Sequence, residues 1–343
     1  MILKNMITSM KLFSQVALRA GTETMRTIIL CLCLPLIVGC DTLIPLKVSP
    51  PTDLAIEYTP ERIARGEYIA KHVTACTHCH SGLDWDYFAG GIPKAGTQGG
   101  GGYHFTESLG LIGGYDLYAR NITPAALGDW TDGELIRAIV EGISRDGKPL
   151  FPIMPYARYR HMDQEDLYSI VAYVRSLEPI PNPLPNKRLK RLFKYIERTF
   201  PKPYDPQLRP DPSNRVAYGE YLATIGDCVF CHTTMTISRK PIAGMEWAGG
   251  NSFPLTGGGK VYSANISPDP ETGIGDWLED DFIELFKSYS EPFKLPASKQ
   301  HENTVMPWVA FSGMTEEDLG AIYEYLMSVK PVSNNVERWP AED

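Results

Sequence analysis

The stretch Cys76-Thr77-His78-Cys79-His80 has a second copy, of the same pattern C-x-x-C-H, at Cys228-Val229-Phe230-Cys231-His232. The chain has 7 Cys and 7 His among its 343 residues. At these frequencies about 0.003 matches are expected by chance, so two matches are a strong signal.

The pattern is typical of covalent haem c attachment. Each Cys thiol forms a thioether bond with the porphyrin, and the adjacent His binds the iron. The spacing suits this chemistry, because a C-x-x-C turn holds two sulfurs near the two vinyl edges and the next residue then projects over the ring. The sequence thus predicts two covalently attached haem c groups, with these residues as their attachment points and proximal ligands: Cys76, Cys79, His80, Cys228, Cys231 and His232.

Paired cysteines also occur in redox-active dithiols and in zinc sites. A thioredoxin-like dithiol usually follows a strand of a βαβ unit, and no such unit is visible near either pair. A zinc site built from both pairs would have to join cysteines separated by 148 residues, far more than in ordinary zinc ribbons. Haem attachment is therefore favoured over both.

The surroundings of the two copies repeat in the same order. Four pairs of segments carry the repeat: Arg65–Tyr68 and Ala217–Tyr221, Asn121–Pro124 and Asn265–Pro268, Gly128–Trp130 and Gly275–Trp277, and Met154–Tyr156 and Met306–Trp308. In both copies the last Met follows the first Cys of the haem motif by 78 residues. The chain is therefore predicted to be a tandem duplication.

Met154 and Met306 are the candidate distal iron ligands. A thioether favours reduced iron, and the Pro after each Met stiffens the segment that would aim it across the ring. Met162 and Met314 also occupy matched positions, 86 residues after the first Cys, and remain the alternative pair. They stand at predicted helix starts, where packing under the cap is the expected role.

Helical periodicity predicts an all-α fold, in which two cytochrome c-like domains each wrap around one haem. Apolar residues recur at i, i+3, i+4 and i+7 from Leu167 and again from Leu319, with Asp163 as N-cap of the first helix, and Thr131 and Glu134 form a capping box. No segment shows sustained strand alternation. The predicted boundaries are a signal peptide at 1–39, a tether at 40–59, the two domains at 60–181 and 213–335, a basic, Pro-rich linker helix at 182–212 and a tail at 336–343.

The N-terminal segment predicts export. Residues 27–39 form an apolar run that is too short to span a bilayer comfortably and has the length of a signal-peptide core. The run ends in a small residue followed by Cys40, which resembles a bacterial lipobox and predicts lipidation of Cys40. If the protein started at Met25, the signal peptide would be more compact. We therefore expect a lipid-anchored protein on the periplasmic side of the inner membrane.

Charge is distributed unevenly along this acidic chain. The net charge of −8 argues against nucleic acid as a partner. Residues 187–202, in contrast, combine an apolar stripe at helical spacing with seven Lys and Arg residues. Two interpretations remain: a helix that straps the two domains together, and a surface that docks on anionic membrane lipid or on a partner.

With these motifs the chain resembles the mono- and dihaem cytochrome c family, and most of all the cytochrome subunits of membrane-bound alcohol and gluconate dehydrogenases. The resemblance covers roughly residues 60–335. Those subunits typically carry three haem motifs, whereas this chain has two. The resemblance implies electron transfer in the periplasm, from a dehydrogenase or a quinol-oxidising complex toward a terminal oxidase or other acceptor, with no catalytic residue of its own.

The alternative is an enzyme with one open haem, such as a dihaem peroxidase or a thiosulfate-oxidising enzyme. A cysteine-ligated catalytic haem is disfavoured, because every Cys after Cys40 already belongs to a haem motif. The equal placement of Met154 and Met306 also argues against one specialised iron.

Overall fold

The computed structural model describes residues 46, 48–105, 115–236, 241–255 and 258–340. The expected signal peptide, the alternative start Met25 and the lipidation site Cys40 lie outside these residues. Residues Leu46–Asp343 belong to one compact unit, which contains both repeats. Within the described ranges no helix is long and apolar enough to cross a membrane.

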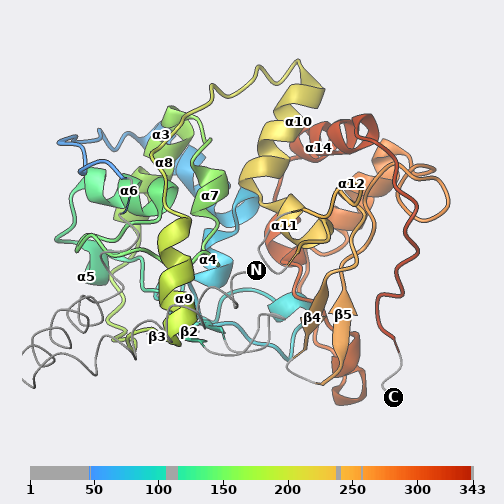
Figure 1. The fold of residues 1–343 in the computed structure, drawn as a ribbon, viewed down its shortest axis with the longest axis horizontal. Helices are drawn as coiled ribbons and strands as arrows, with labels where there is room; N and C mark the ends of the chain where they lie inside the picture. Colours follow the sequence, from blue (N-terminus) through green and yellow to red (C-terminus); the bar gives the residue numbers. More distant parts are fainter. Residues whose placement is uncertain (1–45, 47, 106–114, 237–240, 256–257, 341–343) are drawn as a thin grey trace, which may run out of the picture. The chain divides into compact units, whose positions relative to one another are not determined.

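The unit is rich in helices, as the periodicity predicted (Figure 1). The first repeat contains α3 (Pro60–Tyr68), the π-helix η3 (Ile69–Val73), α4 (Cys76–Cys79), the 3-10 turn η4 (Phe88–Gly90), α5 (Pro124–Leu127), α6 (Asp132–Glu141), α7 (Tyr156–Tyr159) and α8 (Gln164–Ser176). The second contains α10 (Arg215–Ile225), α11 (Cys228–His232), α12 (Glu279–Lys287), the 3-10 turn η7 (Ala297–Glu302), α13 (Trp308–Phe311) and α14 (Glu316–Ser328).

Helix starts follow the predicted capping chemistry. Thr131 and Glu134 form the expected capping box at the start of α6. The Asp163 carboxylate accepts backbone N–H bonds at the start of α8, and the Thr315 hydroxyl does the same for α14. These caps fix where each terminal helix begins.

Short strands are the main departure from the all-α expectation. The antiparallel strands β1 (His104–Phe105), β2 (Tyr115–Tyr118) and β3 (Arg188–Leu189) form one small sheet, and β4 (Ser252–Pro254) pairs with β5 (Lys260–Tyr262). Each strand has two to four residues. A run of this length is too short to show the alternation by which a strand is recognised in sequence.

In each repeat the first helix packs against the last, α3 on α8 and α10 on α14 (Figure 1). A glycine stands at each contact. A Cβ built on Gly66 would lie 1.8 Å from the carbonyl oxygen of Ser169, and one on Gly219 would lie 1.9 Å from that of Ala321. The two helix backbones can therefore approach this closely only because neither position carries a side chain.

Replacing Gly66 or Gly219 with Ala should lower the free energy of unfolding by about 1–3 kcal/mol, because the helices must move apart. Gly82→Ala is the matched control, since its Cβ would meet Thr97 at an ordinary 3.5 Å. Thermal and urea unfolding of the haem-loaded protein measures the difference. Wild-type stability in both helix variants would show that the close approach is not required.

The first repeat carries one extra residue between its first helix and its haem motif. Ten positions separate Gly66 from Cys76, but nine separate Gly219 from Cys228. The extra residue is absorbed in η3, where the N–H of Thr74 donates to the carbonyl of Ile69, five residues back, at 2.8 Å. Single π turns commonly accommodate such changes inside α-helices.

The two repeats contact each other through a reciprocal pair of tyrosines. The Tyr68 hydroxyl lies 2.6 Å from a carboxylate oxygen of Asp318 and accepts the N–H of Thr315 at 3.1 Å. The Tyr221 hydroxyl lies 2.7 Å from Asp166 and accepts the N–H of Asp163 at 3.2 Å. Each repeat thus places its first-helix tyrosine on the cap of the other repeat's last helix, as in a contact with approximate two-fold symmetry.

Both tyrosines are protonated donors. Burial and the neighbouring carboxylates of Asp318 and Asp166 raise the pKa of Tyr68 and of Tyr221. Asp166 is 0% exposed, and Arg65 and Arg209 also bind it, at 2.9 and 2.5 Å. The contact is therefore a hydrogen-bonded polar cluster inside the boundary between the repeats.

Tyr68→Phe and Tyr221→Phe should each lower the free energy of unfolding by about 1–3 kcal/mol, because each leaves a carboxylate short of a donor. Tyr173→Phe is the control: its hydroxyl accepts from Gln98 inside the first repeat, at 2.9 Å. Limited proteolysis of the Pro-rich residues 201–212 should accelerate in the first two variants and not in the control. Equal proteolysis rates in all three would contradict this role.

The segment between the repeats differs from a continuous strap helix. Arg188 and Leu189 pair with β2 as strand β3. In the rest of residues 182–212, only α9 (Arg191–Ile196) and the 3-10 turn η6 (Glu197–Thr199) are helical. Leu189 and Phe193 pack on a small core of first-repeat residues, Phe105, Leu117, Ala119 and Phe151. Leu189 and Phe193 of the apolar stripe thus cover the first repeat, because strand pairing and side-chain burial there outweigh helical periodicity.

Candidate functional site

Each C-x-x-C-H stretch forms a single helical turn that starts abruptly. The residue before the first Cys adopts the left-handed conformation in both repeats, with φ 48° at Ala75 and φ 53° at Asp227. Few non-glycine residues adopt this conformation. The turn separates the haem motif from the preceding helix, so that α4 and α11 begin at Cys76 and Cys228. No sequence signal marked these two positions.

Three of the motif cysteines, Cys76, Cys79 and Cys228, are free thiols. Cys79 is exposed, and Cys76, Cys228 and Cys231 are half-buried. No group of three or more His, Cys, Asp or Glu is gathered as a metal site in the part of the chain that the structure describes. The two Cys pairs therefore do not meet in one four-cysteine zinc site there.

Both motif histidines are oriented in the same way. Nδ1 of His80 lies 2.6 Å from the carbonyl oxygen of Arg120, and Nδ1 of His232 lies 2.8 Å from that of Ala264. A histidine that binds a metal commonly donates its other ring N–H to a backbone carbonyl, which fixes the ring orientation. With Nδ1 engaged, Nε2 is the ring nitrogen left to bind iron.

The charge state of these rings suits metal binding. Desolvation lowers the pKa of both His80 and His232, and the hydrogen bonds to the carbonyls partly oppose this effect. Both imidazoles are therefore neutral near pH 7. A neutral imidazole has the lone pair that a metal ion requires.

The carbonyl that orients each histidine is held by the next residue, Asn121 or Asn265. The Asn121 side chain accepts from both the N–H and the hydroxyl of Thr123 and donates to the carbonyl of Ile180 at 2.7 Å. Asn265 accepts in the same way from Ser267 and donates to the carbonyl of Val332 at 2.8 Å. Each asparagine thus pins the turn to the chain that follows the terminal helix.

The Gly-rich loops close against the same histidines. The N–H of Gly101 donates to the carbonyl of His80 and that of Gly249 to the carbonyl of His232, both at 2.8 Å. Both glycines have positive φ, and a Cβ on either would lie within 2.6 Å of backbone. Only glycine fits at these positions, which explains why glycines gather after each haem motif.

The two candidate methionine pairs lie in different environments. Met162 and Met314 are 0% and 3% exposed within the core. Met154 and Met306 are half-buried at its margin, each in a tight turn: its carbonyl accepts the N–H of the residue after Pro at 2.9 and 2.8 Å. The side chains of Met154 and Met306 therefore retain accessible surface, as a ligand to an added group requires.

Four of the other histidines have partners away from the motif histidines. Nε2 of His104 lies 2.6 Å from Asp116, and Nδ1 of His72 lies 2.9 Å from the carbonyl of Ala310 in the second repeat. His161 lies beside Asp205 and His301 beside Glu302. His78 is buried, and burial lowers its pKa to about 4.

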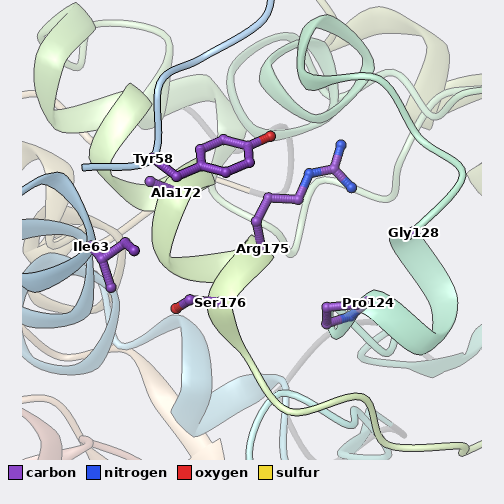
Figure 2. Close-up of a pocket in the computed structure, with 7 residues that line it drawn as sticks. All are labelled: Tyr58, Ile63, Pro124, Gly128, Ala172, Arg175 and Ser176. Atoms are coloured by element: carbon purple, nitrogen blue, oxygen red, sulfur yellow. The ribbon is translucent and has the colours of Figure 1, made fainter. Parts of the chain in front are cut away.

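Two cavities lie apart from the motif cysteines and histidines. One of about 410 Å³ lies beside α8, where Figure 2 shows Arg175 and Tyr58. Both side chains bind Asp132, at 3.0 and 2.7 Å, so the charge of Arg175 is already paired. The other, of about 300 Å³, lies between the repeats and is lined by residues that include His72 and Lys94. Neither cavity contains a motif Cys, His80 or His232 in its lining.

The residues therefore fit haem c on four counts that recur in both repeats. The two thiols of each motif stand on one helical turn, the histidine ring is oriented by Nδ1, its carbonyl partner is pinned by an asparagine, and a half-buried methionine is available.

No family model matches the chain. The cytochrome c subunit of alcohol dehydrogenase (quinone) from Gluconacetobacter polyoxogenes is 29% identical over 84% of this chain and 58% of its own length. The gluconate 2-dehydrogenase cytochrome c subunit of Pantoea cypripedii is 28% identical over 78% and 59%, and the fructose dehydrogenase cytochrome subunit of Gluconobacter japonicus is 28% identical over 78% and 52%.

The matched region thus spans little more than half the length of these relatives. The homologues of this chain are cytochrome c subunits of alcohol, gluconate and fructose dehydrogenases, as its motifs predicted.

Proposed function

We propose that the protein is a dihaem c-type cytochrome that passes electrons from a dehydrogenase or a quinol-oxidising complex toward a terminal oxidase or other acceptor. The observation that carries this proposal is the matched geometry at His80 and His232, each with Nδ1 bound to a backbone carbonyl. The relatives add support, since their printed names are those of cytochrome subunits of dehydrogenases.

In this proposal residues 60–181 and 213–335 are two cytochrome c-like domains. Cys76 and Cys79 hold one haem c through thioether bonds, and Cys228 and Cys231 hold the other. His80 and His232 are the proximal ligands, and Met154 and Met306 the distal ligands. Each bound haem would supply a one-electron couple of its iron.

The chain's own residues would set the potential and protect the iron. The pinned carbonyls of Arg120 and Ala264 hold the imidazoles in place and raise their basicity as ligands. Met154 and Met306 would bind the same iron ions as the histidines, which would exclude outside ligands and favour the reduced state. Such a site exchanges electrons without binding a substrate.

We further propose that Cys40 is lipidated after removal of residues 1–39. The lipid would anchor the protein to the periplasmic face of the inner membrane. Its electron donor and acceptor would then meet it at that surface.

Met154→Ala and Met306→Ala should each lower the reduction potential of one haem, by part of the roughly 0.8 V range that axial ligands span. Potentiometric titration of the purified protein measures this. Met162→Ala and Met314→Ala are the matched controls: they remove buried side chains and should cost about 2–5 kcal/mol of stability without moving either potential. A lower potential in the control variants instead would show that the distal ligands are assigned wrongly.

The enzyme alternative is tested by adding cyanide to the oxidised protein. Two methionine-ligated haems should leave the near-infrared spectrum unchanged at neutral pH, because neither iron has an open position. A high-spin haem that binds cyanide or peroxide would favour an enzyme with one open haem.

A further inference from the structure

Residues 187–202, here called the basic segment, present a group of exposed cations on an acidic protein. Among the Lys and Arg side chains of this segment that the structure describes, Arg188, Lys190, Lys194 and Lys202 are exposed. The whole chain carries a net charge of −8. A local positive surface on such a chain attracts an anionic partner within about one Debye length, roughly 10 Å at 0.1 M salt.

The basic segment is held firmly on the first repeat. Leu189 pairs with Tyr115 of β2 and, with Phe193, packs on the small core that includes Phe151. Within the basic segment, Lys187 binds Glu197 at 2.5 Å, and Glu197 is only 7% exposed. Leu189 and Phe193 thus face the protein, and the exposed cations lie on a surface whose backbone is fixed.

The end of the basic segment lies where the N-terminal tether joins the fold. The N–H of Tyr204, two residues after Lys202, donates to a carboxylate oxygen of Glu141 at 3.0 Å. The backbone of Ser49 also binds Glu141. The tether continues along α6, where the carbonyl of Thr52 fills the space above Gly133. One carboxylate therefore joins the tether to the chain that leaves the basic segment.

We propose that the basic segment docks on the anionic headgroups of the membrane to which Cys40 is anchored. The inference rests on the proposed lipidation for its choice of partner. Nine residues lead from Ser49 back to Cys40, and an extended chain of that length spans at most about 30 Å. A lipid at Cys40 would therefore keep Glu141, and with it the end of the basic segment, close to the bilayer surface. Docking would hold the first repeat in a fixed orientation on the membrane.

The test uses haem-loaded protein exported with an ordinary cleavable signal in place of residues 1–40, so that no lipid is attached. Binding is measured by co-sedimentation with vesicles of phosphatidylcholine alone and of phosphatidylcholine with phosphatidylglycerol. We expect binding to the anionic vesicles at low salt. It should be lost at about 1 M salt, where the Debye length is about 3 Å.

Lys194→Glu/Lys202→Glu should weaken binding to the anionic vesicles by about 30-fold or more, given the usual contribution of each cation near an anionic surface. Lys260→Glu/Lys330→Glu is the matched control, because both lysines are exposed in the second repeat and the charge change is the same. The control should bind nearly as wild type does.

Three results would overturn the proposal: no binding to anionic vesicles at any salt, equal binding to neutral vesicles, or equal loss in both double variants. The first would favour an acidic protein as the partner of the basic segment. Haem content and reduction potentials, measured on the same samples, report on the proposed electron-transfer function separately. If docking fails while both haems keep their reduction potentials, the proposed electron-transfer function is not contradicted.

Discussion

Both candidate haem sites depend on one hydrogen bond, from Nδ1 of the motif histidine to the backbone carbonyl that precedes Asn121 or Asn265. A C-x-x-C-H turn alone would leave the imidazole free to rotate. The carbonyl fixes the ring, the asparagine fixes the carbonyl, and the segment after the terminal helix fixes the asparagine. The helix pair that carries this segment approaches closely because of Gly66 and Gly219. The site is thus coupled to the packing of the whole repeat.

The two repeats are alike in these bonds and differ where they meet. Arg158 of the first repeat lies 3.4 Å from Asp227, the residue before Cys228. The counterpart of Arg158 in the second repeat is Ala310, and its carbonyl instead meets His72. His72 stands in the π-helix that absorbs the extra residue of the first repeat. One insertion and one ion pair therefore give the two haem motifs different electrostatic surroundings within a nearly symmetric contact.

Much of this could be predicted from the sequence, because the deciding signals are local. The cysteine and histidine motifs, the terminal helices and the caps at Thr131 and Asp163 depend on residues a few positions apart. The carbonyls that orient the histidines could not be predicted, because every residue has a backbone carbonyl whatever its side chain. The left-handed Ala75 and Asp227 also lacked a signal, as neither residue type favours that conformation strongly enough to mark it. The apolar stripe of the basic segment predicts a helix and does not reveal the pairing of Leu189 with Tyr115, so strand β3 could not be predicted.

The central claim is that each C-x-x-C-H stretch holds one haem covalently. Mass spectrometry of the intact, denatured protein tests it most directly, with Cys76→Ser/Cys79→Ser and Cys228→Ser/Cys231→Ser beside the wild type. The account predicts the added mass of two haem groups for the wild type and of one for each double variant. A wild-type mass without haem, or the loss of both haems from one variant while the other keeps two, would contradict it.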